Sequence, residues 1–217
     1  MSKTIIASIF WGFYESSEIR FAEKYFKGTT DIVELGSSCG IVSSHFISKL
    51  QAYKKFIAVE ANSGLLKVLK INLERYKHNN AEIIILNNAL HYGAAQVSFQ
   101  LSNNTTESRI ANGLTHSGDM VTIQAITLDN IVNRYHLNNY SLVCDIEGAE
   151  AAIFMNETAA LSNCKYIFIE LHAIQYAGIN YSVDQLKTMI TQKGFAQKDQ
   201  HGPVCYFERM ANSKIKV

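Results

Sequence analysis

The stretch DIVELGSSCG, residues 31–40, joins a short apolar run to a turn that carries two glycines. The run is typical of a buried β-strand, and the apolar spacing after it predicts a helix through about Leu50. In the turn, Gly36 would let the backbone approach a ligand, and Gly40 would permit close packing at the helix start. A strand, a tight turn and a helix in this order begin a βαβ unit, which predicts parallel strands in one sheet.

The same rhythm returns along most of the chain. Further strands are expected at residues 56–60, 83–86, 141–145, 166–170 and 204–207, and further helices at residues 65–76, 128–135, from about 149, and 183–193 before a capping Gly194. Alternating strands and helices require a parallel sheet with right-handed crossovers and helices on both faces. We therefore expect an α/β fold of the Rossmann-like kind.

Two parts of the chain depart from this rhythm. Residues 96–101 and 121–126 alternate polar and apolar side chains, as half-exposed strands do, and a polar stretch separates them. We expect an inserted hairpin and a lid loop within residues 95–126, although a disordered insertion explains the polar stretch equally well. Before the first strand, an amphipathic helix is expected at residues 16–26, inside an N-terminal cover at residues 1–30.

Composition narrows the class of partner. The 217 residues contain no linker-like stretch, so residues 1–217 are expected to form a single domain. The formal net charge is +1, and no run of basic and aromatic residues favours a nucleic acid. The sequence contains no run of about 18 consecutive apolar residues, so it predicts no membrane-spanning helix. The four cysteines lack the spacing of metal or redox sites, which favours reduced thiols in a cytoplasmic protein. Since the charge disfavours a large polyanion, we expect a small-molecule or saccharide acceptor.

Two glutamates bear on which nucleotide the glycine turn would bind. Glu60 follows the second expected strand at close to the ~20-residue offset of a ribose-binding carboxylate, although a surface carboxylate near a helix N-terminus is the alternative. Glu34 lies directly before the turn, whose glycines have GxxxG rather than GxGxxG spacing. A carboxylate there would repel a pyrophosphate but tolerate the positive charge of S-adenosylmethionine. The turn therefore favours a methyl donor over a dinucleotide.

More carboxylates follow the later strands. Asp145, Glu147 and Glu150 lie where a strand meets its helix, and the helix dipole accounts for one of them but not for all three. Glu170 and His172 project to the same side of the next strand, where His172 is a candidate general base and Glu170 would orient an acceptor. The alternative for His172 is an ordinary surface histidine. Asp145, Glu147 and Glu170 are also candidate ligands for Mg²⁺, which prefers oxygen.

Six motifs, read in chain order, resemble the FkbM family of methyltransferases. They are VELGSSCG at 33–40, AVEAN at 58–62, LNNAL at 86–90, ITLD at 126–129, CDIEGAE at 144–150 and IELH at 169–172. The most specific is DIEGAE, which is similar to that family's signature DVEGxE. The resemblance implies a class I methyltransferase fold, with a mostly parallel seven-stranded sheet and a reversed edge strand. It also implies O-methylation of a hydroxyl on a sugar, a polyketide or another secondary metabolite.

The resemblance implies a set of site residues as well. S-adenosylmethionine would contact Glu34, Gly36 and Gly40 at its methionine end, Glu60 at its ribose, Asn88 and Ala89 at its adenine, and Ser37, Ala61 and Asp145 elsewhere. The acceptor side would hold Asp145, Glu147, Glu170 and His172. Ser108 and Arg109 of the lid loop are candidate acceptor-binding residues on a separate ground, because functional residues concentrate on long loops. Two residues depart from the family pattern: Cys39 stands where the family commonly has Asn, and Glu34 where it commonly has Asp.

Methyl transfer from a sulfonium is an in-line displacement, so the protein must mainly align the acceptor oxygen and remove its proton. His172 is the expected base, and Asp145 is its rival. Two other functions are left open. A nicotinamide-dependent oxidoreductase would need a GxGxxG turn, which is absent, and an inactive S-adenosylmethionine-binding module would not need the carboxylates or His172. A homodimer is compatible with the sequence.

Overall fold

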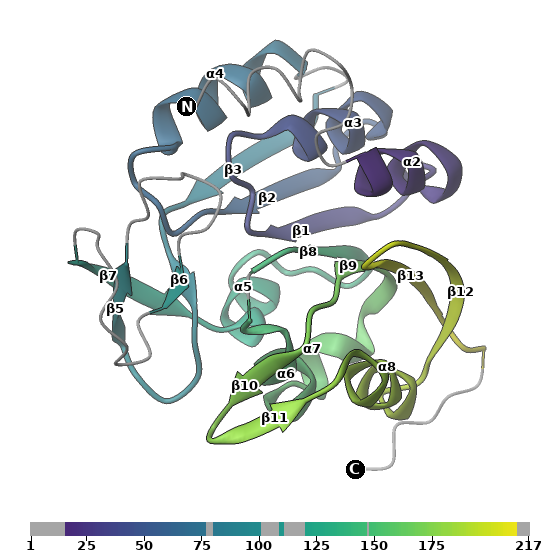
Figure 1. The fold of residues 1–217 in the computed structure, drawn as a ribbon. Coiled ribbons are helices and arrows are strands. Elements are labelled where there is room, and N and C mark those ends of the chain that lie inside the picture. The colour runs from purple at the N-terminus through teal and green to yellow at the C-terminus, as the bar shows by residue number, and fades with distance from the viewer. Residues whose placement is uncertain (1–15, 77–79, 101–108, 111–119, 147, 212–217) are drawn as a thin grey trace.

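Seven strands form the central sheet of the computed structural model, which describes residues 16–76, 80–100, 109–110, 120–146 and 148–211 (Figure 1). In spatial order they are β12 (Phe195–His201), β13 (Val204–Arg209), β9 (Cys164–Glu170), β8 (Tyr140–Cys144), β1 (Asp31–Leu35), β2 (Lys55–Val59) and β3 (Glu82–Leu86). The pairs from β9 to β3 are parallel, and β13 is antiparallel to both its neighbours. The mostly parallel sheet with one reversed strand is therefore confirmed, but the reversed strand lies one place inside the edge because β12 occupies the outer position.

Helices cover both faces of this sheet, as the alternating pattern predicts. Figure 1 shows α2 (Ser16–Tyr25), α3 (Ile41–Lys49) and α4 (Leu66–Tyr76) on one face, and α5 (Leu128–Arg134), α6 (Glu150–Asn156), α7 (Ala159–Ser162) and α8 (Val183–Gln192) on the other. Each strand contributes side chains to the hydrophobic cores on both faces of the sheet, because successive side chains along a strand point to opposite faces. In β1, Ile32 packs with α2, α3 and α4, whereas Val33 and Leu35 pack in the opposite core.

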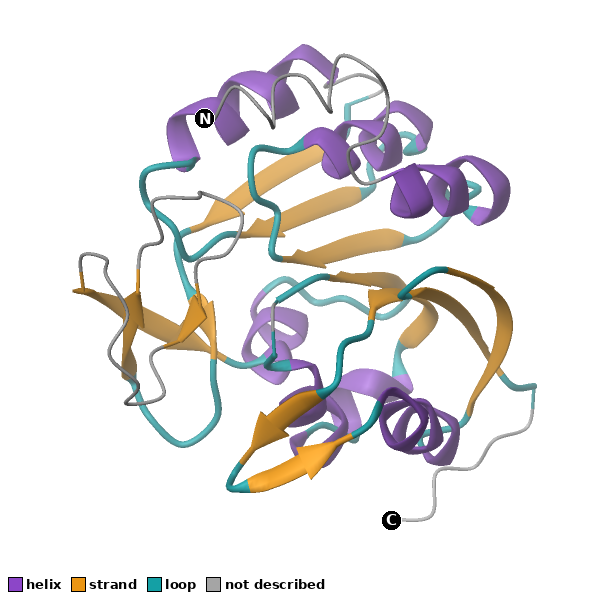
Figure 2. Ribbon diagram, in the orientation of Figure 1, coloured by secondary structure: helices purple, strands orange, loops and turns teal. Residues whose placement is uncertain are grey.

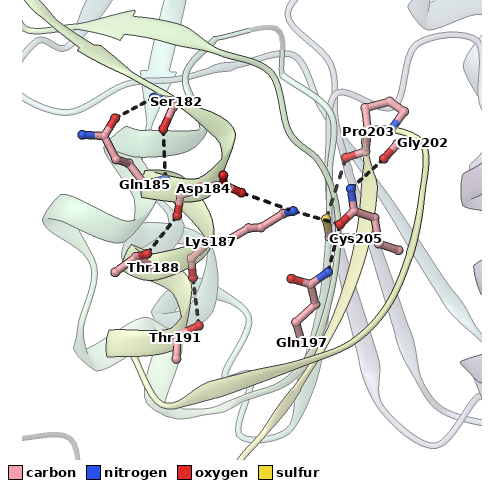
Figure 3. Close-up of polar contacts among 11 residues, drawn as sticks. Ser182, Asp184, Gln185, Lys187, Thr188, Thr191, Gln197, Gly202, Pro203 and Cys205 are labelled. Carbon is pink, nitrogen blue, oxygen red and sulfur yellow. Dashed lines mark hydrogen bonds and ion pairs between the residues drawn. The ribbon is translucent and has the colours of Figure 1, made fainter.

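The start of α8 shows how the sequence sets a helix boundary. Ser182 Oγ accepts a hydrogen bond from the Gln185 N–H at 3.3 Å, and Gln185 Oε1 accepts one from the Ser182 N–H at 2.8 Å (Figure 3). This capping box satisfies two N–H groups that a helix start leaves without partners. At the other end, Gly194 follows the helix with a φ of +88°, the left-handed conformation expected of a glycine cap.

The insertion after β3 forms a second sheet of four strands. They are β4 (Ala89–Leu90), β5 (Gln96–Gln100), β6 (Arg109–Ile110) and β7 (Met120–Ile126), in the order β4-β7-β5-β6. The expected antiparallel pair is confirmed, because β5 and β7 pair from Gln96 with Gln124 to Gln100 with Met120. Residues 101–108 and 111–119 lie outside the described residues, so the lid loop stays a prediction.

A second hairpin follows β9 directly, and sequence reasoning did not predict it. Strands β10 (Ile174–Tyr176) and β11 (Ile179–Tyr181) pair antiparallel around Ala177 and Gly178, whose φ angles are 50° and 79°. Two central residues with positive φ are typical of a tight hairpin turn, for which alanine is an unusual residue. Each strand has three residues, which is too short to show a period-2 pattern.

The helix α2 packs at the end of the sheet formed by β12 and β13. Tyr25 stacks on Tyr206 with ring centroids 4.1 Å apart, and its hydroxyl donates to Asp199 Oδ2 at 2.6 Å. Lys24 Nζ donates to the same oxygen at 2.8 Å. Hydrogen bonds from Lys24 and then Tyr25 hold the pKa of Asp199 well below its usual range. In the part of the chain that the structure describes, no helix is long and apolar enough to cross a membrane.

Candidate functional site

The carboxyl ends of the parallel strands lie at one edge of the central sheet, where the arrowheads of Figure 2 point toward the inserted sheet. Backbone hydrogen bonds tie these ends together. The Gly36 N–H donates to Val59 O at 3.0 Å, and the Asp145 N–H donates to Leu35 O at 3.0 Å. In open α/β sheets, ligands bind outside this edge. The turns after β1, β2, β3 and β8 thus form one framework at the expected site.

Both glycines of the first turn are required by neighbouring atoms. A Cβ added at Gly36, where φ is +85°, would lie 1.8 Å from the Asp145 carbonyl oxygen. Close approach of the β8 backbone therefore requires this glycine, whether or not a ligand is bound. Gly40 is the N-cap of α3 with a φ of +84°, and a Cβ there would lie 2.9 Å from Leu69 Cδ1 of α4. The expected close packing at the helix start is observed.

Glu34 lies beneath the turn, inside the protein, with 2% of its surface exposed. Ser43 of α3 donates a hydrogen bond to its carboxyl oxygen Oε2. Burial is the main cause that raises the pKa of Glu34 from 4.5 to about 7. The nearby hydroxyls of Ser37 and Ser43 oppose this shift, and the charge of Glu60 adds to it. A group with a pKa near 7 changes charge within the physiological range.

Glu60 directly follows β2 and is 7% exposed. Its oxygen Oε2 accepts the N–H of Ser38 at 2.7 Å, and Oε1 accepts the N–H of Asn62 at 2.7 Å. Burial raises the pKa of Glu60, and these two backbone hydrogen bonds oppose the rise. An ionised carboxylate offers about four acceptor positions. The two oxygens thus retain acceptor capacity for the paired hydroxyls of a ribose, so this residue fits the nucleoside of S-adenosylmethionine.

Two asparagines that sequence reasoning missed hold these turns. Asn72 of α4 donates from Nδ2 to Cys39 O at 2.7 Å. Asn87 donates from Nδ2 to the carbonyl oxygens of Glu60, at 2.9 Å, and Ala61, at 3.0 Å. The sequence does carry two signals for Asn87, which directly follows a strand and lies within the LNNAL motif at 86–90.

The residues expected at the adenine come together on the side of the inserted sheet. Ala89 is buried with Val97 and Ile123, and Ala61 packs against this apolar group. Asn88 Nδ2 donates to a backbone carbonyl of β7, that of Gln124, at 3.1 Å. Because Val97 and Ile123 are buried, this group supports the partly buried Ala61, which directly follows Glu60 and could contact a flat aromatic base.

Glu170 and His172 lie in contact at the end of β9, as their alternation predicts. His172 Nε2 is 3.0 Å from Glu170 Oε1, and the two side chains are 40% and 20% exposed. The other ring nitrogen, Nδ1, is buried and has no hydrogen-bond partner among the described residues. Glu170 therefore holds the imidazole through Nε2.

The remaining predicted residues have different outcomes. Asp145 lies against Gly36, at the centre of the edge. Glu150 is fully buried, and its carboxyl oxygens accept the Gly148 N–H at 3.2 and 3.0 Å, so its role is structural. Glu147 and Ser108 lie outside the described residues, and of Arg109 only the backbone, in β6, is described. Within the described residues no three His, Cys, Asp or Glu side chains gather to hold a metal ion, so the Mg²⁺ prediction gains no support.

Comparison with known proteins gives a family and a fold. The family model "Methyltransferase FkbM domain" matches residues 40–196. A solved structure titled as an FkbM methyltransferase, from Methylobacillus flagellatus, is 15% identical with a TM-score of 0.55, over 90% of this chain and 49% of that one. The chain thus spans about half the length of that protein. A fibrillarin of Aeropyrum pernix with natively bound S-adenosylmethionine is 14% identical, with a TM-score of 0.44 over 94% and 74% of the two chains. Among curated proteins, no match was found.

Proposed function

The chain belongs to the FkbM family of methyltransferases, and we propose that it transfers the methyl group of S-adenosylmethionine to a hydroxyl of a small acceptor, a sugar or a secondary metabolite. One observation carries the proposal. Glu60 directly follows β2, and Glu170 and His172 lie at the end of β9, so a carboxylate suited to ribose and an acid–base pair lie on opposite sides of the glycine turn. A donor bound across this turn would present its reactive end between them.

On the cofactor side, Glu60 would hold the ribose, and Ala61, Asn88 and Ala89 would line the adenine. The turn after β1, from Gly36 to Gly40, would face the methionine end, whereas Glu34 lies beneath it with its side chain turned to Ser43 in the core. S-adenosylmethionine supplies an electrophilic methyl group. The chain's own task is to orient the acceptor oxygen and to accept its proton, which requires a positioned base.

On the acceptor side, we assign proton removal to Glu170 and His172 acting as a pair. Glu170 Oε1 and His172 Nε2 lie 3.0 Å apart, so a proton accepted by one group can pass to the other. Asp145 is the rival base, because it lies next to the β1 turn.

The cofactor assignment is tested by calorimetric titration of the purified protein with S-adenosylmethionine, S-adenosylhomocysteine and NADH. We expect micromolar binding of the first two. Glu60→Gln should weaken binding about tenfold or more, since it replaces a charged acceptor of ribose hydroxyls by a neutral amide. Glu82→Gln, at the opposite end of β3, is the matched control and should bind normally. Binding of NADH alone would support the oxidoreductase reading instead.

The acceptor assignment needs an activity measurement. Disruption of the gene in the source organism, followed by mass spectrometry, should reveal a compound lighter by one methyl group. With that compound as acceptor, Glu170→Gln and His172→Gln should bind S-adenosylhomocysteine as the wild type does but lose most of the turnover, because they remove only the base. Binding without transfer by the wild-type protein would instead identify an inactive module.

A further inference from the structure

Asn87 directly follows β3, and its side chain reaches the neighbouring turn. The parallel pairing of β2 with β3 ends at Val59 and Leu86, and the Glu60 N–H donates the last backbone hydrogen bond, to Leu86 O at 3.0 Å. Beyond that point the Asn87 amide takes over, with hydrogen bonds to the Glu60 and Ala61 carbonyls at 2.9 and 3.0 Å. The side chain thus continues the link between the two strand ends after their backbones have separated.

This link matters because it bears on the direction in which the Glu60 carboxylate can accept further hydrogen bonds. Its carboxylate is planar, and backbone N–H groups of Ser38 and Asn62 already occupy one position on each oxygen. The direction of the acceptor positions that remain is therefore fixed by the backbone of Glu60 and of these two turns. Asn87 is the side chain that holds the Glu60 and Ala61 carbonyls, so it controls the backbone that carries the carboxylate.

We propose that Asn87 is a positioning residue that directs the Glu60 carboxylate toward the two ribose hydroxyls of the cofactor. The inference rests on the proposed function, since it presumes a nucleoside at Glu60. Asn87 is exposed, and its bonds replace bonds to water, so it should contribute little to global stability. A residue whose loss impairs recognition of the ribose but not folding has a role in positioning, and the two effects can be measured separately.

The test compares two ligands on one variant. S-adenosylhomocysteine and its 2′,3′-dideoxy analogue differ only in the hydroxyls that Glu60 would hold. The wild type should prefer the first ligand, and Asn87→Ala should bind it about tenfold more weakly, while its affinity for the analogue stays unchanged. Asn87→Asp keeps the shape but removes the N–H donors, so it should behave like Asn87→Ala. The matched control is Asn156→Ala, which removes the same kind of bond, from Nδ2 to Ala152 O at 2.8 Å, on α6.

Each outcome has a distinct meaning. If both Asn87 variants retain the wild-type preference for the hydroxylated ligand, Asn87 does not position Glu60, and the proposed function still stands. If both variants lose affinity for the two ligands equally, the effect of the substitutions is structural. The inference then fails, and the proposed function still stands. If the wild type binds neither ligand, the proposed function fails and the inference falls with it. The thermal unfolding midpoint of each variant shows whether it is folded at the temperature of the binding measurements.

Discussion

The buried carboxyl of Glu34 should make the stability of this protein fall as pH rises. In the native state its pKa is about 7, whereas 4.5 is the ordinary value. Between these values the native state holds a proton that the unfolded chain has released, so the unfolded state gains in relative stability as pH increases. One pKa unit corresponds to ~1.4 kcal/mol, so the full effect is about 3 kcal/mol.

The variant Glu34→Gln isolates this effect, because a glutamine oxygen can still accept the hydrogen bond of Ser43 but carries no titratable proton. Urea unfolding at about pH 5.5 and about pH 8 measures the free energy of unfolding of both proteins. The wild type should lose about 2 kcal/mol relative to the variant between these conditions. All other groups titrate in both proteins, so the difference between them reports on Glu34. An equal difference at both pH values would refute a buried, protonated carboxyl.

Three further substitutions test the glycine turn, with its control, and the contact of α2 with the sheet. Gly36→Ala should destabilise the protein by about 2–4 kcal/mol in urea unfolding, since it combines a positive φ with a clash against the Asp145 carbonyl. Gly178→Ala has a similar φ and open space, so it should cost only about 1 kcal/mol, and equal losses would contradict the clash. Asp199→Asn should reduce the gain in stability that the wild type shows as pH rises toward 3.8, the ordinary pKa of Asp199, because Lys24 holds the native pKa of this group below that value. An unchanged dependence of stability on pH in this acid range would show that the contact contributes nothing.

Much of the fold could be predicted from the sequence because strands and helices each leave a periodic pattern of apolar and polar residues. The strand at residues 31–35, its glycine turn and the helix after it are each set by local spacing, and the pairing of Glu170 with His172 follows from alternation along one strand. The position of the reversed strand has no such signal. β12 occupies the edge and β13 lies between β12 and β9, and this order depends on how the strands are connected rather than on the spacing of side chains within either of them.

Other features have no periodic signal. The hydrogen bonds of Asn72 and Asn87 join side chains to distant backbone carbonyls, and only the folded chain brings these atoms together. The position of Glu34 is a second example. The sequence places it beside the turn, but whether it faces a ligand or the core depends on the packing of α3, and the structure shows it facing Ser43 in the core.

The contact of Gly36 with the Asp145 carbonyl has a consequence for anyone who wishes to alter the range of acceptors. Since the Asp145 carbonyl lies against Gly36, any substitution around Asp145 that moves this backbone would also move the first turn, and would change binding on both sides of the proposed site. Directed evolution would do better to vary the hairpin β10–β11, which follows β9 and holds none of the residues assigned to the cofactor. Loops on a rigid scaffold tolerate such variation best, so we expect natural relatives of this chain to have diversified there.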